Sequence, residues 1–249
     1  MGAKELFQSG RLQEAIQALG GEVRDNPTDA RRRTFLFELL CFAGQFERAR
    51  KQLNALAKES VDTETGALLY RSALAAEQVR QDFFEQRRYP ALSQDSGSRP
   101  FAGTLNGKPF HTLEDADPRI GPRLEVFVAG EYLWVPFEYV GSIEMEAPRQ
   151  LRDLMWSAAF VTTGPAFKGK ELGQVLLPML SPQSWQHAED AVKLGRATEW
   201  QEVDGTPVPF GQKLLLVDDE EVIPFLEIRE LRFQPAETDP AEAASPQVS

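Results

Sequence analysis

Apolar residues recur with a helical period through the first third of the chain, and one pattern occurs twice. The hexamer GRLQEA (10–15) returns as GQFERA (44–49), 34 residues further on. That distance is the length of a tetratricopeptide-type helix-turn-helix repeat, in which a small residue on the second helix lets the first helix approach closely. Ala15 and Ala49 occupy that small position. The pattern therefore predicts paired helices of the tetratricopeptide type.

Two further helices are expected after the second copy of the pattern. One is predicted over about 64–77, and a fourth runs on through Val79, Phe83 and Phe84. Isolated repeats cannot bury their own apolar faces, and roughly three are needed for stability. The array is near that minimum, so we expect it to pack against the rest of the chain.

The helical period gives way to short runs of β-branched and aromatic residues after Pro90. The stretch 90–100 is rich in turn-forming residues, as is typical of a linker. Strands are predicted at 124–128, 132–137, 142–145, 158–162, 175–180, 213–217 and 222–228, and short helices only at 151–156 and 187–195.

This organisation predicts an α+β protein. Its expected parts are tetratricopeptide-like helical repeats over 1–89, a linker over 90–100, a β-rich region over 101–233 that forms a small barrel or a bent sheet, and a disordered acidic tail over 234–249.

The charge of the chain narrows the choice of partners. Its formal net charge is −11, whereas nucleic-acid binding depends on clustered lysine and arginine. The one basic run is Arg31-Arg32-Arg33. We expect it to pair with nearby acids such as Asp29 or Glu38, or to meet an acidic partner.

The sequence also indicates the cellular compartment of the protein. No apolar stretch approaches the roughly 18 residues of a membrane span, and the first residues lack the apolar core of a signal peptide. The single cysteine, Cys41, cannot form an intramolecular disulfide. We therefore expect a cytosolic protein without nucleic-acid or membrane partners.

Candidate catalytic chemistry is sparse. The segment GPAFKGKE (164–171) resembles a phosphate-binding loop, but Glu171 stands where Ser or Thr would ligate Mg²⁺. Asp115 and Asp117 lie in a loop that resembles a Ca²⁺ site without matching its spacing, so roles in turns and caps are expected. A hydrolase that uses Lys170, Asp115 and Asp117 is the weaker alternative. No residue is assigned to catalysis, a cofactor or a metal.

The second repeat holds more aromatic residues than one helix can bury on a single side. A surplus apolar stripe on a helical repeat suits an amphipathic helix from another protein. The predicted partner-binding residues are Phe35, Leu39, Phe42 and Phe46, or the seam where they meet the β-rich region, with Arg31, Arg32 and Arg33 at the rim. The alternative is that these aromatic side chains all belong to the core.

Five long segments in a fixed order carry a family resemblance. They are RRTFLFELLCFAGQFERARKQL (32–53), LNGKPF (105–110), LEDADPRIGPRLEVF (113–127), GSIEMEAPRQLRDLMW (141–156) and LGRATEW (194–200). Together they resemble the ImpE family, also called TagJ or SciE-type proteins, which are accessory proteins of bacterial type VI secretion. The likeness spans about residues 3–233.

The resemblance implies a cytosolic protein of helical repeats and a β-rich region, with no catalytic activity. It also implies binding to the amino-terminal helix of the small sheath subunit, TssB, and an influence on sheath assembly or on recycling by the ATPase ClpV. The family provides no site residues to transfer to this sequence. A generic repeat-type adaptor for an extended peptide is the alternative.

Overall fold

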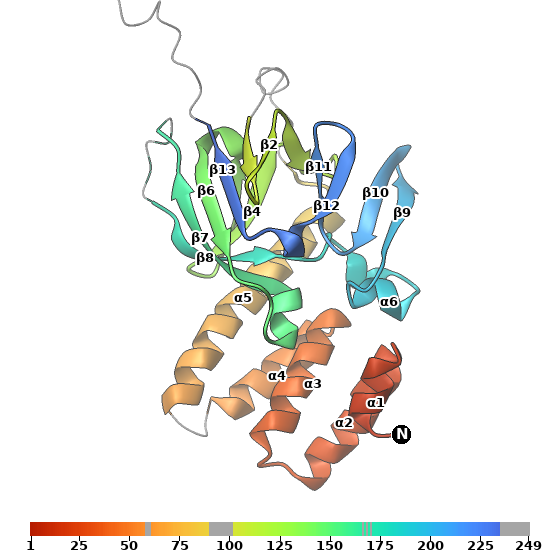
Figure 1. Ribbon diagram of the computed structural model, residues 1–249. Coiled ribbons are helices and arrows are strands. Elements are labelled where there is room, and N and C mark those ends of the chain that lie inside the picture. The colour runs from red at the N-terminus through yellow and green to blue at the C-terminus, as the bar shows by residue number, and fades with distance from the viewer. Residues whose placement is uncertain (58–60, 90–101, 166, 168, 170, 235–249) are drawn as a thin grey trace, which may run out of the picture.

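The computed structural model places a group of helices against one side of a large twisted sheet (Figure 1). The structure describes residues 1–57, 61–89, 102–165, 167, 169 and 171–234. The predicted linker, 90–100, and the predicted acidic tail beyond residue 234 lie outside the described residues.

Two helix pairs and one long helix form the amino-terminal part. They are α1 (Ala3–Gln8), α2 (Leu12–Asp25), α3 (Ala30–Phe42), α4 (Phe46–Leu56) and α5 (Val61–Glu85). Ala15 on α2 and Ala49 on α4 are completely buried. This burial agrees with the close helix contact that the 34-residue repeat predicts.

The glycine that opens each repeated hexamer ends a helix. Gly10 and Gly44 have φ angles of +77° and +67°, which glycine adopts without strain. After Gly10, the N–H of Arg11 donates to the carbonyl of Leu6 at 2.9 Å, and after Gly44 the N–H of Gln45 donates to the carbonyl of Leu40 at 2.8 Å. Each copy is thus a Schellman-type stop followed by a new helix.

The two helices predicted after the second repeat are one helix in the structure. Helix α5 runs unbroken from Val61 to Glu85. Residues 77–84, where the third predicted helix gives way to the fourth, contain neither glycine nor proline, and Glu77 and Arg80 are buried. The prediction of two separate helices is therefore wrong, because nothing in this stretch stops the helix.

An eight-stranded antiparallel sheet dominates the remainder. Its order is β2-β1-β13-β6-β7-β8-β4-β5, while β12-β11-β3 and β10-β9 form two smaller sheets. The strands are β1 (Gly103–Leu105), β2 (Lys108–Phe110), β3 (Leu113–Asp115), β4 (Arg123–Val128), β5 (Glu131–Pro136), β6 (Val140–Met145), β7 (Trp156–Thr163), β8 (Gly173–Pro178), β9 (Thr198–Val203), β10 (Thr206–Gly211), β11 (Leu214–Val217), β12 (Glu221–Pro224) and β13 (Glu230–Phe233). The large sheet ends at β2 and β5, which do not pair with each other, so among the described residues it is not a closed barrel.

The two short predicted helices are confirmed only in part. Segment 151–156 contains the 3₁₀ turn η3 (Leu151–Leu154), and 187–195 contains the single-turn helix α6 (Asp190–Lys193). The last predicted strand, 222–228, ends early because β12 stops at Pro224 and the 3₁₀ turn η5 (Phe225–Glu227) follows. The fold class itself, helical repeats followed by a sheet-rich region, is confirmed.

The sheet region caps the first helix pair. The carboxylate of Asp190 on α6 accepts the N–H of Leu12 at 2.8 Å and so serves as the cap of α2. The guanidinium of Arg196 donates to the carbonyls of Phe7 and Gln8 at the end of α1 and lies 4.7 Å from the Phe7 ring centroid. The segment LGRATEW thus contributes to attaching the helices to the sheet region.

Candidate partner-binding site

The structure buries two of the apolar residues that the sequence assigned to a partner and partly buries the other two, Phe35 and Phe46. Leu39 and Phe42 are 0% and 1% exposed. The Phe35 ring lies edge-on to Phe7 at 5.5 Å, and the Phe46 ring lies edge-on to Trp185 at 6.2 Å. The alternative interpretation, that these side chains belong to the core, fits this packing better, because α1 and the sheet region already cover them.

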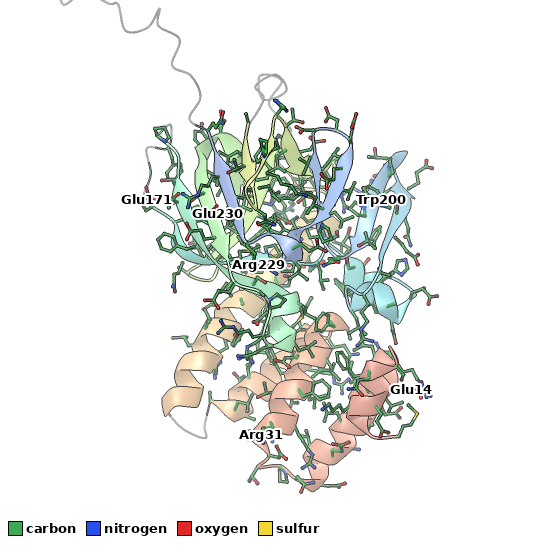
Figure 2. All side chains as sticks on the ribbon, in the orientation of Figure 1. Glu14, Arg31, Glu171, Trp200, Arg229 and Glu230 are labelled. Carbon is green, nitrogen blue, oxygen red and sulfur yellow. The ribbon has the colours of Figure 1, made fainter. Side chains whose placement is uncertain are left out.

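The basic run is partly engaged within the chain. Arg32 forms ion pairs with Asp29 and Glu22, at 2.7 and 3.3 Å. Arg33 donates to the side-chain oxygen of Gln52 at 2.9 Å. Arg31 is exposed at the end of the helices farthest from the sheet (Figure 2). A role for these arginines at the rim of a partner site stays a prediction.

A buried ionic network joins α5 to the sheet. The guanidinium of Arg80 donates to both oxygens of Glu125 on β4, at 2.8 and 2.9 Å. Lys213 donates to Glu125 at 2.7 Å and also pairs with Asp115. All four side chains are at most 2% exposed.

Electrostatics sets the charge state of this network. Burial alone would raise the pKa of Glu125, but Arg80 and Lys213 outweigh it and hold that pKa well below its usual range. Burial raises the pKa of Asp115 to about 7, although Lys213 opposes the rise. These charges are shielded from solvent, so they hold the two parts of the chain together and offer nothing to a partner.

The sheet region also covers the face formed by α3 and α5. The Trp156 ring at the start of β7 lies 6.5 Å from Phe37, and its indole N–H donates to Glu77 at 2.9 Å. Arg152 on η3 pairs with Glu38 at 3.2 Å and stacks over Tyr70 at 4.8 Å. An extended peptide could not occupy this face unless the chain's own residues left it, which disfavours the generic repeat-type adaptor.

An open cleft remains where the first half of α5 meets the sheet. Its volume is about 790 Å³. Leu69, Ser72 and Ala73 of α5 form one wall. The floor and the far end come from five neighbouring strands, through Phe127, Ala158, Phe160, Gln174, Leu176, Glu144 and Glu230.

The floor of the cleft is the uncovered part of one sheet face. Trp156, Ala158 and Phe160 alternate along β7 and so point to the same face. Trp156 is buried against α3, whereas Ala158 is exposed and Phe160 is 48% exposed. Leu69, on the opposite wall, is 49% exposed. The helices therefore cover this face of β7 at Trp156 but leave it open from Ala158 onward.

The register of the strands arranges the floor in two rows. One row runs from Glu144 through Phe160 to Gln174, and the next runs from Ala158 through Leu176 to Phe127. The second row is thus apolar throughout, and Phe160 adds an apolar side chain at the centre of the first row. This shape suits an apolar helix face, since a helix placed beside α5 would extend the helical layer over the bare strands.

The amino-acid sequence contains only a partial signal for this cleft. Leu69 falls within the predicted third helix and Phe160 within the predicted strand 158–162, but neither is among the predicted partner-binding residues. That strand is apolar at four consecutive positions, from Ala158 to Val161, a pattern typical of cover on both faces. Here one of those faces is open.

Glu171 of the phosphate-loop lookalike and Asp115 and Asp117 of the acidic loop have partners within the chain. The carboxylate of Glu171 accepts the N–H and the hydroxyl of Thr163, at 2.9 and 2.7 Å. Asp115 is 2% exposed, and Asp117 is 1% exposed and paired with Arg119 at 2.6 Å. Lys170 lies outside the described residues. The two buried aspartates cannot reach a substrate in solvent, which disfavours the hydrolase.

The described residues offer neither a cluster of metal ligands nor a helix that could span a membrane. They contain no group of three or more His, Cys, Asp or Glu side chains placed to hold a metal ion. None of the described helices combines the length and the apolar character needed to cross a membrane.

Comparison with known proteins shows which family and which structures this chain resembles. Residues 107–232 match the family model described as ImpE protein, and residues 6–75 match a tetratricopeptide repeat model. The type VI secretion system accessory component TagJ of Pseudomonas aeruginosa is 35% identical, over 94% of this chain and 92% of that protein. The crystal structure of protein VPA1032 from Vibrio parahaemolyticus has a TM-score of 0.81 and 27% identity, over 94% of this chain and 98% of that one.

Proposed function

This chain belongs to the ImpE family, and from that premise we propose that it is a non-catalytic adaptor of the bacterial type VI secretion system that binds the amino-terminal helix of the small sheath subunit, TssB. An accessory role in type VI secretion rests on the likeness to TagJ. The choice of TssB rests on the family resemblance, and the choice of a helix is supported by the shape of the cleft. The proposed place of action is the cytosol.

We place the docked helix in the cleft beside α5. The observation that carries this choice is the pair of half-exposed apolar side chains, Leu69 on the α5 wall and Phe160 on the open floor of the cleft. An amphipathic helix would set anchors at i, i+3 or i+4, and i+7 along this floor. The repeat residues Phe35, Leu39, Phe42 and Phe46 are the second choice, because a partner must first displace Phe7 or Trp185 to reach Phe35 or Phe46.

A downstream effect on the sheath completes the proposal. A chain bound to the amino-terminal helix of TssB would cover or present that helix during sheath assembly or during recycling by ClpV. ClpV-driven disassembly of purified sheaths, measured with and without this protein, tests that step. An unchanged rate of disassembly and an unchanged yield of assembled sheath would together contradict it.

The binding step is tested by titrating TssB, with and without its amino-terminal helix, into the protein. Phe160→Asp is expected to weaken binding about tenfold or more, because an apolar anchor at the centre of an interface contributes strongly. Val222→Asp is the matched control, since Val222 is 46% exposed on β12 and does not line the cleft. A melting curve for each variant separates lost binding from lost folding.

Each outcome of this titration assigns the site. If TssB without its helix binds as well as intact TssB, the helix-in-cleft mechanism is wrong. If binding needs the helix and survives Phe160→Asp but is lost in a folded Phe46→Ala variant, the site lies on the repeats instead.

A further inference from the structure

The ribbon formed by β9 and β10 extends away from the large sheet, at the side of the molecule where Figure 2 labels Trp200. Six consecutive residue pairs join its strands, from Thr206 opposite Val203 to Gly211 opposite Thr198. Among the described residues β9 pairs with no other strand, so its second edge is open.

Two prolines fix which backbone groups face that open edge. Pro207 lies opposite Glu202 and Pro209 lies opposite Trp200. Proline has no N–H, so neither proline can belong to a pair that exchanges both hydrogen bonds. In an antiparallel ladder the residues of the other pairs point their N–H and C=O groups away from the partner strand. Trp200 and Glu202 therefore direct these groups outward.

The same prolines make the ribbon asymmetric. The outer edge of β10 lacks donors at Pro207 and Pro209 and cannot be extended as a regular ladder. The outer edge of β9 keeps its donors and acceptors. Its four central residues, 199–202, are all exposed, and Trp200 is 49% exposed.

The charge of the ribbon defines what can pair with it. Residues 198–211 contain Glu199, Glu202 and Asp204 and no lysine or arginine. Asp204 is paired with Arg87 at 2.6 Å, and Glu199 lies 3.3 Å from His187, whereas Glu202 is exposed beside Trp200 on the open edge. Edge strands are commonly protected by lysine. Carboxylates here repel a second copy of the ribbon and attract a cationic strand.

We propose that the open edge of β9 binds an extended basic segment of a partner protein by β-strand addition. The backbone of the segment would pair with Trp200 and Glu202, its lysine or arginine side chains would face Glu202, and one could stack on the Trp200 indole. This surface is separate from the cleft beside α5, so a basic strand and a docked helix could bind at the same time.

The test uses the full chain and the peptide acetyl-Lys-Val-Lys-Val-Lys-Val-amide, titrated by NMR. Glu202→Gln removes only the charge. Glu202→Pro also removes one outward N–H, and it spares the ladder to β10, because Glu202 already lies in a pair without mutual hydrogen bonds. We expect Glu202→Pro to bind the peptide about fivefold more weakly than Glu202→Gln, the effect of one lost hydrogen bond.

A second probe separates strand pairing from simple charge attraction. The same peptide methylated on every backbone nitrogen keeps its charge and loses its donors, so it is expected not to bind. Equal binding of the methylated and unmethylated peptides, or equal binding by folded Glu202→Pro and Glu202→Gln variants, would overturn the proposal. Phe160→Asp should leave peptide binding unchanged, which keeps this result independent of the proposed TssB site.

Discussion

Arg80 and Glu125 face each other inside the protein through two hydrogen bonds, 2.8 Å from Nε to Oε1 and 2.9 Å from Nη2 to Oε2. One residue belongs to the helices and the other to the sheet, and neither side chain is more than 1% exposed. Separating α5 from β4 would therefore leave two charges to be resolvated or re-paired. The two parts of the chain are expected to unfold as one cooperative unit.

Arg80→Met should be strongly destabilising. The change leaves Glu125 with Lys213 as its remaining cationic partner, and removing one member of a buried ion pair typically costs about 3–5 kcal/mol. Urea unfolding gives the free-energy change directly. Arg11→Met is the control, because Arg11 and Glu14 form a pair that is about half exposed, and such pairs contribute at most about 1 kcal/mol. Equal losses in the two variants would contradict the assigned role of Arg80.

Asp115 should make stability depend on pH. Its carboxyl has a pKa of about 7 in the folded protein and an ordinary value of 3.8, so between these values the folded state holds a proton that the unfolded state has released. The free energy of unfolding is therefore expected to fall as pH rises from about 4 to 7, by up to about 1.4 kcal/mol per pH unit. Above that window this contribution is constant.

The measurement for Asp115 is urea unfolding of the native protein and of Asp115→Asn at several pH values. The stability of the native protein relative to the variant should decline across that window, because the amide binds no proton. Glu125 contributes with the opposite sign and only in acid, since its lowered pKa gives stability that is lost as pH falls below its ordinary value of 4.5. A difference that stays constant from pH 4.5 to 7.5 would show that Asp115 is ionised throughout.

The two repeat glycines should differ in their tolerance of alanine. Both have positive φ, so each substitution strains the backbone, by about 1 kcal/mol. A β-carbon at Gly44 would also lie 2.3 Å from the Trp185 ring, whereas at Gly10 the nearest outside atom, from Arg196, is 3.8 Å away. Gly44→Ala should therefore lower the urea midpoint clearly more than Gly10→Ala. Similar midpoints would mean that Trp185 moves aside at little cost.

Enlarging the small position of the second repeat should also destabilise the protein. Ala49 is completely buried, and inserting a larger side chain into a well-packed core typically costs about 1–3 kcal/mol. Urea unfolding of Ala49→Leu measures the loss, and Ala75→Leu at an exposed position of α5 is the control. An unchanged midpoint for Ala49→Leu would contradict close helix packing at that position.

Local sequence patterns predicted those helices and strands that short apolar runs or repeats mark. Short runs of β-branched and aromatic residues indicated β4 to β8, and the repeated hexamer indicated the first two helix pairs. The β9–β10 hairpin was missed, because β9 is almost entirely exposed and β10 carries two prolines. Neither strand has the apolar alternation from which a strand is normally inferred.

The binding surface could not be predicted from local patterns, because it depends on which distant residues cover the helices. The aromatic residues of the second repeat did indicate an apolar surface, but Trp156 and Trp185, more than a hundred residues later, cover part of it. The buried network was also missed. Its available signals were Glu125 within the apolar run LEVFV and Lys213 at the start of KLLLV, each of which needs an opposite charge once it is buried.

The cap that Asp190 provides for α2 has a consequence for the order of events during synthesis. Leu12 leaves the ribosome long before its partner, which follows 178 residues later. Arg196, which holds the end of α1, also arrives late. The nascent helices must therefore persist with frayed ends until most of the polypeptide has been translated. A chain interrupted before residue 190 should be a substrate for proteases and chaperones, however complete its helical repeats are.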